Sequence, residues 1–278
     1  MSLAENRAEE IDYVDTQIAY MVPMSDKPRR YLCSPPPGVE EISWKSVPQR
    51  MSIRNGRLAG NELRLDAQGL ILRPHDTAIK DFFDGNEIKS TYYSEMERLV
   101  RDLTGASKVM VFDYNVRSSS KSDRGRTGAY PPARFAHADY TLSSGPQRVR
   151  DLLPQAEAAE RLRRRFAFFN VWRSISGPIE DDALAVCDAQ SVDQSNLIPT
   201  DLVYTDRTGE FYNLIHDAKH RWYYFPRMRR DEAMIFRCFD SIDPARANCV
   251  PHSSFHDPHA PANPAPRESI EARTVAFY

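Results

Sequence analysis

The sequence predicts a mainly β protein with flanking helices. From residue 166 to the end, short segments rich in β-branched and aromatic residues alternate with turn signals, a pattern typical of an all-β sandwich or barrel. Helical periodicity is confined to the first 165 residues, and the proline clusters at 33–38, 130–134 and 256–266 indicate loops between strands. We expect a single domain over 1–278, in which strands and helices of 1–105 pack on a β core formed by 106–278.

The first half of the chain contains both kinds of element. Strands are expected at 11–22, 69–72 and 107–116, where apolar and β-branched residues dominate. A helix is expected at 88–105, because apolar residues recur with helical spacing and Gly105 stands where helices commonly end. Two more helices are expected at 145–154 and 155–166. The polar segment 117–132 is long for a loop in a compact domain, and we interpret it either as a candidate lid over a site or as a disordered insert or surface hairpin.

The second half of the chain consists mostly of expected strands. They share β-branched and aromatic content and are bounded by Gly, Pro, Asp or Asn. The segments are 166–175, 183–189, 201–206, 210–215, 221–226, 232–239 and 269–278.

Composition excludes several classes of partner. Lys and Arg number 37 against 39 Asp and Glu, a formal net charge of −2, so no basic field favours nucleic acid. No apolar run has the length of about 18–20 residues that a membrane-spanning helix needs. The four cysteines, Cys33, Cys187, Cys238 and Cys249, form no CxxC pair, which favours a reduced, cytoplasmic setting. The oligomeric state stays open.

The segment "ARFAHADYT" places His137 and Asp139 two residues apart. On a strand, this spacing puts both side chains on one face. His-x-Asp with one distant histidine is the composition of the 2-His-1-carboxylate triad, which binds Fe(II) and leaves positions open for a cosubstrate and O₂. The third histidine would come from "PHSSFHDPHAP", which contains His252, His256 and His259. A pair of hydrogen-bonded strand residues would give the same short motif.

A second motif follows the histidine cluster. In "PRESIEARTVAF", Arg267 and Ser269 share one face of an expected strand. A guanidinium fork binds a carboxylate bidentately, and a serine hydroxyl adds a further hydrogen bond. Iron enzymes that use 2-oxoglutarate need such a pair at the far end of the cosubstrate. The order His-x-Asp, late His and Arg-x-Ser therefore predicts an Fe(II) and 2-oxoglutarate site.

Four blocks of the chain resemble the hydroxylase/desaturase family of secondary metabolism, which includes gibberellin-desaturase-like proteins and a component of cephalosporin methoxylation. They are "ARFAHADYTLSSGPQRV", "FFNVWRSISGPIEDDALAVCDAQSV", "HRWYYFPRMRRDEAMIFRCFDS" and "VPHSSFHDPHAPANPAPRESIEARTVAF". The resemblance covers roughly 105–278. It implies a double-stranded β-helix (jelly-roll) core and a dioxygenase that uses Fe(II), 2-oxoglutarate and O₂ to oxidise an unactivated C–H bond of a small molecule. The outcome would be hydroxylation, desaturation or oxidative cyclisation.

The resemblance also assigns residues. It implies that His137, Asp139 and His252 bind iron and that Arg267 and Ser269 bind the cosubstrate. Spacing from Arg267 instead favours His256 as the third ligand, so this choice stays open, with His252 preferred. His259 is expected to face solvent.

Substrate contacts are predicted at Arg117, Tyr114 and Arg173. Arg117 and Tyr114 end the strand before the candidate lid. Arg173 either reaches into the barrel or pairs with an acid at 180–182 or with Asp188.

Three alternatives stand beside this interpretation. A zinc hydrolase would use the same ligands but has no use for Arg267 and Ser269. A non-catalytic jelly roll would bind a small molecule without needing the metal. The segment "HDAKH" (216–220) resembles the zinc motif HExxH, but it lies between two expected strands and we interpret it as a hairpin turn.

Overall fold

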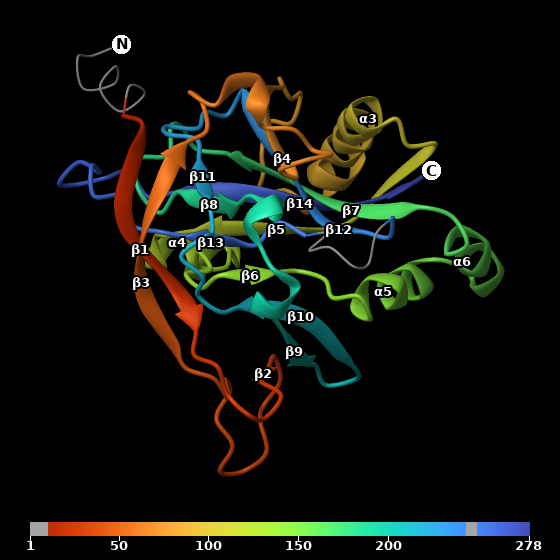
Figure 1. Cartoon of the computed structure of the whole chain (residues 1–278). Helices are drawn as coiled ribbons and strands as arrows, with labels where there is room; N and C mark the ends of the chain where they lie inside the picture. Colours follow the sequence, from red (N-terminus) through yellow and green to blue (C-terminus); the bar gives the residue numbers. More distant parts are fainter. Residues whose placement is uncertain (1–10, 243–248) are drawn as a thin grey trace.

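The computed structural model describes residues 11–242 and 249–278. Two curled β-sheets face each other, and helices pack around them (Figure 1). The main hydrophobic cluster fills the space between the sheets, because it draws buried side chains from both. This arrangement is the mainly β, jelly-roll fold that was expected.

The larger sheet has nine strands in the spatial order β1-β3-β11-β8-β13-β6-β10-β9-β2. Its strands are β1 (Tyr13–Met21), β2 (Arg29–Tyr31), β3 (Ser46–Asn55), β6 (His137–Ala138), β8 (Leu184–Cys187), β9 (Leu197–Val203), β10 (Thr208–Leu214), β11 (Trp222–Tyr224) and β13 (His252–Ser254). Short central strands make room for loops, and three of them, β8, β13 and β6, lie side by side.

The smaller sheet has five strands in the order β4-β12-β7-β14-β5. Its strands are β4 (Leu70–Pro74), β5 (Lys108–Ser118), β7 (Phe166–Ser174), β12 (Glu232–Asp240) and β14 (Glu268–Phe277). The helical elements are η1 (Gly60–Glu62), α2 (Gly85–Glu87), η2 (Ile88–Tyr92), α3 (Tyr93–Thr104), α4 (Lys121–Thr127), α5 (Ser144–Leu152), α6 (Gln155–Arg161), η3 (Ala189–Ser191) and η4 (Gln194–Asn196).

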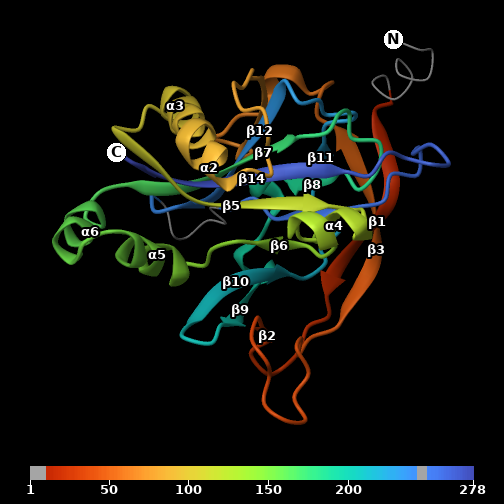
Figure 2. The ribbon, with the colours of Figure 1, turned by 180° about the vertical axis from the view of Figure 1, so that it is seen from behind.

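Burial on both faces explains the continuous apolar runs of the central strands. Every residue of β7 and β12 is buried. Met234 and Phe236 of β12 face the main cluster between the sheets, whereas Ala233 and Ile235 belong to a second cluster that includes α3. Figure 2 shows α3 lying over the outer face of this sheet. Strands covered on both faces lose the usual apolar–polar alternation.

The sequence located most strands and missed a few elements. Strands β1, β4, β5, β7, β8, β10, β11, β12 and β14 and helices α3, α5 and α6 lie where they were expected. Strand β3 was missed, because "SVPQRMSIRN" is mostly polar and only Met51, Ile53 and Asn55 of it are buried. The segment 117–132 is not wholly irregular, because it contains α4. Strand β6 holds only two residues, so Asp139 lies just beyond the strand that was expected to carry it.

Helix α3 ends as the sequence predicts, which gives a test of the fold. Gly105 has φ +70°, and the space that a β-carbon would occupy there is open. Gly105→Ala should therefore lower the free energy of unfolding by about 1 kcal/mol, because an L-residue is strained in the left-handed region. Urea unfolding of the variant measures the change. Gly177→Ala is the control, since this glycine also has open space and its φ is not positive; equal losses in both variants would contradict the prediction.

Candidate metal centre and cosubstrate site

Strand pairing brings the two halves of the predicted triad together. His252 of β13 is paired with His137 of β6 across the nine-stranded sheet, although 115 residues separate them in the chain. Their ring centroids lie 4.4 Å apart. Asp139 follows His137 at the end of the short strand. All three side chains are at most about a tenth exposed.

The ligand atoms of these residues converge on one point. The Oδ1 atom of Asp139 lies 3.8 Å from Nε2 of His137 and 3.8 Å from Nε2 of His252. Within the described residues, this is the group of His, Cys, Asp and Glu side chains whose ligand atoms all lie within 4.8 Å of one another. Such spacing fits a single small cation with two nitrogen ligands and one oxygen ligand.

Backbone carbonyls fix the orientation of both imidazoles. Nδ1 of His137 donates to the carbonyl of Phe135 at 2.9 Å, and Nδ1 of His252 donates to the carbonyl of Val250 at 3.2 Å. A ring whose Nδ1 carries the proton has a free lone pair on Nε2. Both lone pairs therefore face Asp139. This is the outer support that metal-binding histidines usually have.

The charge states also suit a metal ion. Burial, and next the neighbouring imidazole, lowers the pKa of His137 to about 3. Burial likewise lowers the pKa of His252. Burial alone would raise the pKa of the Asp139 carboxyl, but Arg273 and the two histidines outweigh it and the pKa is lowered. Two neutral imidazoles and one carboxylate are the protonation states that a divalent cation requires.

The second oxygen of Asp139 is already bound by protein groups. Oδ2 accepts a hydrogen bond from Nδ2 of Asn170 at 2.8 Å and lies 3.5 Å from Nε of Arg273. Arg273 also forms ion pairs with Glu271 at 3.1 Å and Asp113 at 3.1 Å. Oδ1 is thus the oxygen that remains for a metal.

A cavity next to the triad is lined by Arg267, one of the two predicted cosubstrate residues. Its lining comprises Arg117, Ala133, His137, Trp172, Leu184, His252, Ser254, Arg267, Glu271 and Arg273. Because side chains alternate along β14, Arg267, Ser269, Glu271 and Arg273 stand on one side of the chain. The structure thus places Arg267 and both histidines of the triad on one cavity, with Ser269 directly behind Arg267 as its hydrogen-bond partner.

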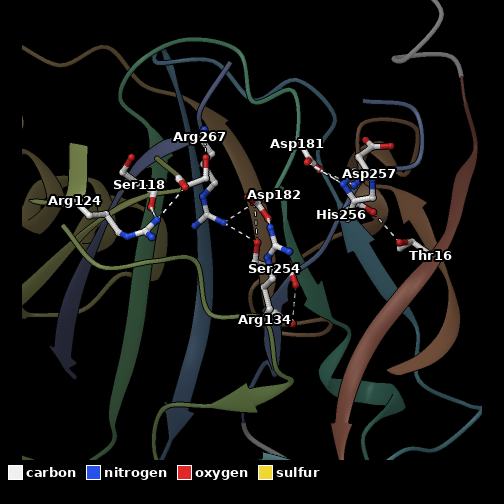
Figure 3. Close-up of polar contacts among 12 residues, drawn as sticks. Thr16, Ser118, Arg124, Arg134, Asp181, Asp182, Ser254, His256, Asp257 and Arg267 are labelled. Carbon is white, nitrogen blue, oxygen red and sulfur yellow. Dashed lines mark hydrogen bonds and ion pairs between the residues drawn. The ribbon is translucent and has the colours of Figure 1, made fainter. Parts of the chain in front are cut away.

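Arg267 is a buried cation held by neutral groups. It is 3% exposed, and its guanidinium stacks over Trp172 at 5.0 Å. Nη1 donates to the carbonyl of Asp182 at 2.6 Å and to the hydroxyl of Ser254 at 3.1 Å (Figure 3). Nε and Nη2 each donate to Ser269 at 3.1 Å. Among the described residues, no carboxylate forms an ion pair with it. Burial, and next the nearby Arg117, lowers its pKa to about 9. An unpaired buried cation calls for an anionic ligand.

Of the three residues predicted to contact substrate, the structure places one at the cavity and two elsewhere. Arg117 lines the cavity and donates from Nη1 to the carbonyl of Pro131 at 2.7 Å. Arg173 is a correction: it lies on the face of β7 opposite Trp172, where it bonds His75 at 2.6 Å and stacks on Tyr92. Tyr114 is also a correction, because it lines a different cavity of about 240 Å³ on the outer side of β5. Alternation along each strand is the cause in both cases.

The remaining histidines lie away from the triad. The side chain of His256 is 67% exposed, and its Nδ1 contacts Asp181 at 2.9 Å (Figure 3). His259 is half exposed beside Asp257. His216 and His220 lie in the connection between β10 and β11, and His220 bonds Tyr20 and Asn196. The geometry therefore favours His252 over His256 as the third ligand.

Sequence reasoning missed Asn170, Asp182, Glu271 and Arg273. The alternation that placed Arg267 and Ser269 on one face continues to Glu271 and Arg273, so this signal was available in "RESIEAR". Asn170 shares a face with Trp172 in the same way. Asp182 lies in an irregular connection before β8, where no periodicity indicates its orientation.

Comparison with known proteins decides the family. A family model described as "Oxidoreductase/YMDC permease-like domain" matches residues 18–277. The chain belongs to this family. Relatives of it include the hydroxylase/desaturase efuI of Hormonema carpetanum, 31% identical over 83% of this chain and 84% of that protein. The hydroxylase/desaturase CTB9 of Cercospora beticola is 29% identical over 92% of this chain and 87% of its own length.

Other relatives of the family are named for their cofactors. The Fe(II)/2-oxoglutarate-dependent dioxygenase nvfI of Aspergillus novofumigatus is 27% identical over 89% of this chain and 90% of that protein. A solved structure of a single-residue variant of the iron and α-ketoglutarate-dependent endoperoxidase NvfI has a TM-score of 0.87 at 24% identity and covers 97% of this chain and 98% of its own. That structure confirms the fold.

These findings confirm the resemblance drawn from the sequence. The chain is an Fe(II)- and 2-oxoglutarate-dependent oxygenase of the hydroxylase/desaturase group, which acts with O₂ on a small molecule. They favour neither the zinc hydrolase nor the non-catalytic binding protein. Within the described residues, no helix is long and apolar enough to cross a membrane.

The ion-pair cluster around Arg273 can be tested in metal-free protein. Arg273→Met should lower the free energy of unfolding by about 3–5 kcal/mol, because it leaves Asp139 and Glu271 buried without their cation. Chemical unfolding measures the loss. Arg50→Met is the matched control: Arg50 also pairs with an aspartate, but its side chain is 79% exposed, so the loss should stay under about 1 kcal/mol. Similar losses in both variants would argue against a buried cluster.

Proposed function

We propose that His137, Asp139 and His252 hold Fe(II) and that Arg267 and Ser269 bind the remote carboxylate of 2-oxoglutarate. The observation that carries this proposal is that two buried charged groups of opposite sign, each suited to a ligand of the other sign, lie beside one cavity. Asp139 brings a carboxylate between two neutral imidazoles, which suits a cation. Arg267 brings a buried cation held by neutral groups, which suits an anion. A zinc hydrolase would have no use for the second feature.

The chain's residues determine how the metal and the cosubstrate would be held. Asn170 and Arg273 occupy Oδ2 of Asp139, so the carboxylate would bind through Oδ1 alone and leave more of the metal open. Asp182 and Ser254 occupy Nη1 of Arg267. The donors that remain for a carboxylate are a hydrogen of Nη2 and the hydroxyl hydrogen of Ser269, which match its two oxygens.

Apolar side chains surround the triad and exclude water. Phe135 stacks on His137 at 4.6 Å, and Phe236 lies 4.9 Å from His252. Iron and 2-oxoglutarate held at this site would supply the oxidation of a substrate C–H bond by O₂, with succinate and CO₂ as the coproducts. The dry surroundings strengthen the electrostatic contacts and limit side reactions. The contribution of this chain is to orient three reactants and to keep water away.

We propose that the substrate is a small natural product and that it approaches past Arg117. Arg117 and Ala133 line the cavity at the two ends of the 117–132 segment. The reaction would be hydroxylation, desaturation or oxidative cyclisation of an unactivated C–H bond. A cytoplasmic location, without nucleic acid or membrane as partner, is supported by four unpaired cysteines and by the net charge of −2.

Anaerobic addition of Fe(II) and 2-oxoglutarate should produce the visible charge-transfer band of a metal-bound keto acid. His137→Ala and His252→Ala should abolish it, because each removes a ligand, and Arg267→Ala should weaken it by raising the Kd of 2-oxoglutarate. His256→Ala is the matched control and should keep the band, since His256 faces solvent. A band that survives His252→Ala but not His256→Ala would reverse the ligand assignment.

If 117–132 is a lid, it should couple the consumption of 2-oxoglutarate to the oxidation of substrate. Arg124 of α4 donates to the carbonyls of Ser118 and Ser119 at 3.0 Å, which ties the helix to the end of β5 (Figure 3). Replacing 121–127 by a short Gly-Ser linker should raise succinate formation in the absence of substrate, because water would enter the site. Succinate release with excess Fe(II) and 2-oxoglutarate is the measurement. An unchanged rate would remove the lid role.

A further inference from the structure

Asp182 has an unusual backbone conformation beside the proposed cosubstrate site. Its φ is +53°, and it is one of two described non-glycine residues with positive φ. The left-handed region is disfavoured for residues with a β-carbon, although Asp and Asn tolerate it better than most. Asp182 is 5% exposed and lies two residues before β8. Strain of this kind persists only where surrounding contacts impose it.

The contacts of Asp182 join the three segments that carry the proposed ligands. Its main-chain carbonyl accepts hydrogen bonds from Nη1 of Arg267 at 2.6 Å and from the hydroxyl of Ser254 at 2.9 Å. Its carboxylate forms an ion pair with Arg134, which lies three residues before His137 (Figure 3). Ser254 in turn lies two residues after His252 on β13.

These contacts decide which donors of Arg267 are free. A guanidinium has five N–H groups in a fixed plane. The Asp182 carbonyl and Ser254 take the two hydrogens of Nη1, and Ser269 takes that of Nε and one of Nη2. Turning the Asp182 carbonyl away would free one hydrogen of Nη1 and leave the guanidinium held by Ser254 and Ser269 alone. The guanidinium of Arg267 would then be held less firmly in its orientation toward the cavity.

We propose that Asp182 is a positioning residue for cosubstrate binding, whose left-handed backbone directs its carbonyl onto Nη1 of Arg267 and so orients the guanidinium and Ser269 toward the remote carboxylate of 2-oxoglutarate. The proposal rests on the assignment of Arg267 as the carboxylate-binding residue. The backbone carbonyl is the acting group, while the carboxylate holds the turn through Arg134. The ion pair has a secondary part because the side chain of Arg134 is 60% exposed.

The test separates backbone conformation from side-chain charge. Asp182→Gly and Asp182→Asn both accept positive φ, whereas Asp182→Ala does not do so without strain. Dissociation constants for 2-oxoglutarate are measured by calorimetry on protein loaded with Mn(II), without turnover. We expect Asp182→Ala to raise the constant about tenfold, and Gly and Asn to raise it about threefold or less. The Mn(II) constant should stay unchanged in all three, which shows that the triad is intact.

Two further variants, Arg267→Gln and Arg134→Met, ensure that each possible result either supports or overturns the positioning role of Asp182. Arg267→Gln is the reference for loss of the carboxylate site. If it weakens 2-oxoglutarate binding and Asp182→Ala does not, the positioning role is wrong and the proposed function stands. If Arg267→Gln has no effect, both are wrong.

Equal losses in the Gly and Ala variants would show that the carboxylate matters and the backbone conformation does not, which would also overturn the proposal. Should Asp182→Ala fail to fold, Arg134→Met, which only loosens the turn, should raise the constant about threefold; no change there would overturn the positioning role.

Discussion

Charge buried between two sheets is the constraint on which this site depends. Asp139, Glu271 and Arg273 balance part of their charge within one cluster. Arg267 stands beside that cluster with hydrogen bonds to neutral groups, and the free oxygen of Asp139 faces two neutral imidazoles. Burial makes such charges costly unless an opposite charge arrives. A divalent metal ion and a dicarboxylate supply those charges together, which relates the electrostatics of the protein to the cofactors of its family.

The two sheets contribute different parts of the site. Short strands of the nine-stranded sheet bring His137 and His252 into register, so pairing of the backbone positions the proposed metal ligands. Long strands of the five-stranded sheet, with the residue just before β14, carry the proposed anion-binding and supporting residues, because alternation turns Arg267 and Asn170 to the same interior. The space between the sheets is thus polar at its centre and apolar around it. Rigid strands hold reactive groups more accurately than loops do.

Sequence reasoning recovered what local periodicity encodes. The fold class, most strands, the His-x-Asp pair and the Arg-x-Ser pair all follow from spacing along single segments. Spacing alone pointed to His256, and the family resemblance preferred His252. The pairing of His252 with His137 joins distant segments of the chain, so only the structure shows it, and it favours His252. Arg173 and Tyr114 were misplaced because the side of the sheet that faces the cavity is not encoded in one strand. Asp182 lies in a turn, and its positive φ cannot be predicted from the residue types around it, so only the structure reveals this conformation.

A crystal structure of the protein soaked anaerobically with Fe(II) and 2-oxoglutarate tests the central claim most directly, with anomalous scattering used to locate the iron. The claim predicts one iron bonded to Nε2 of His137, Oδ1 of Asp139 and Nε2 of His252, and a cosubstrate whose remote carboxylate contacts Arg267 and Ser269. Iron at His256 and Asp181, or a carboxylate bound away from Arg267, would contradict it.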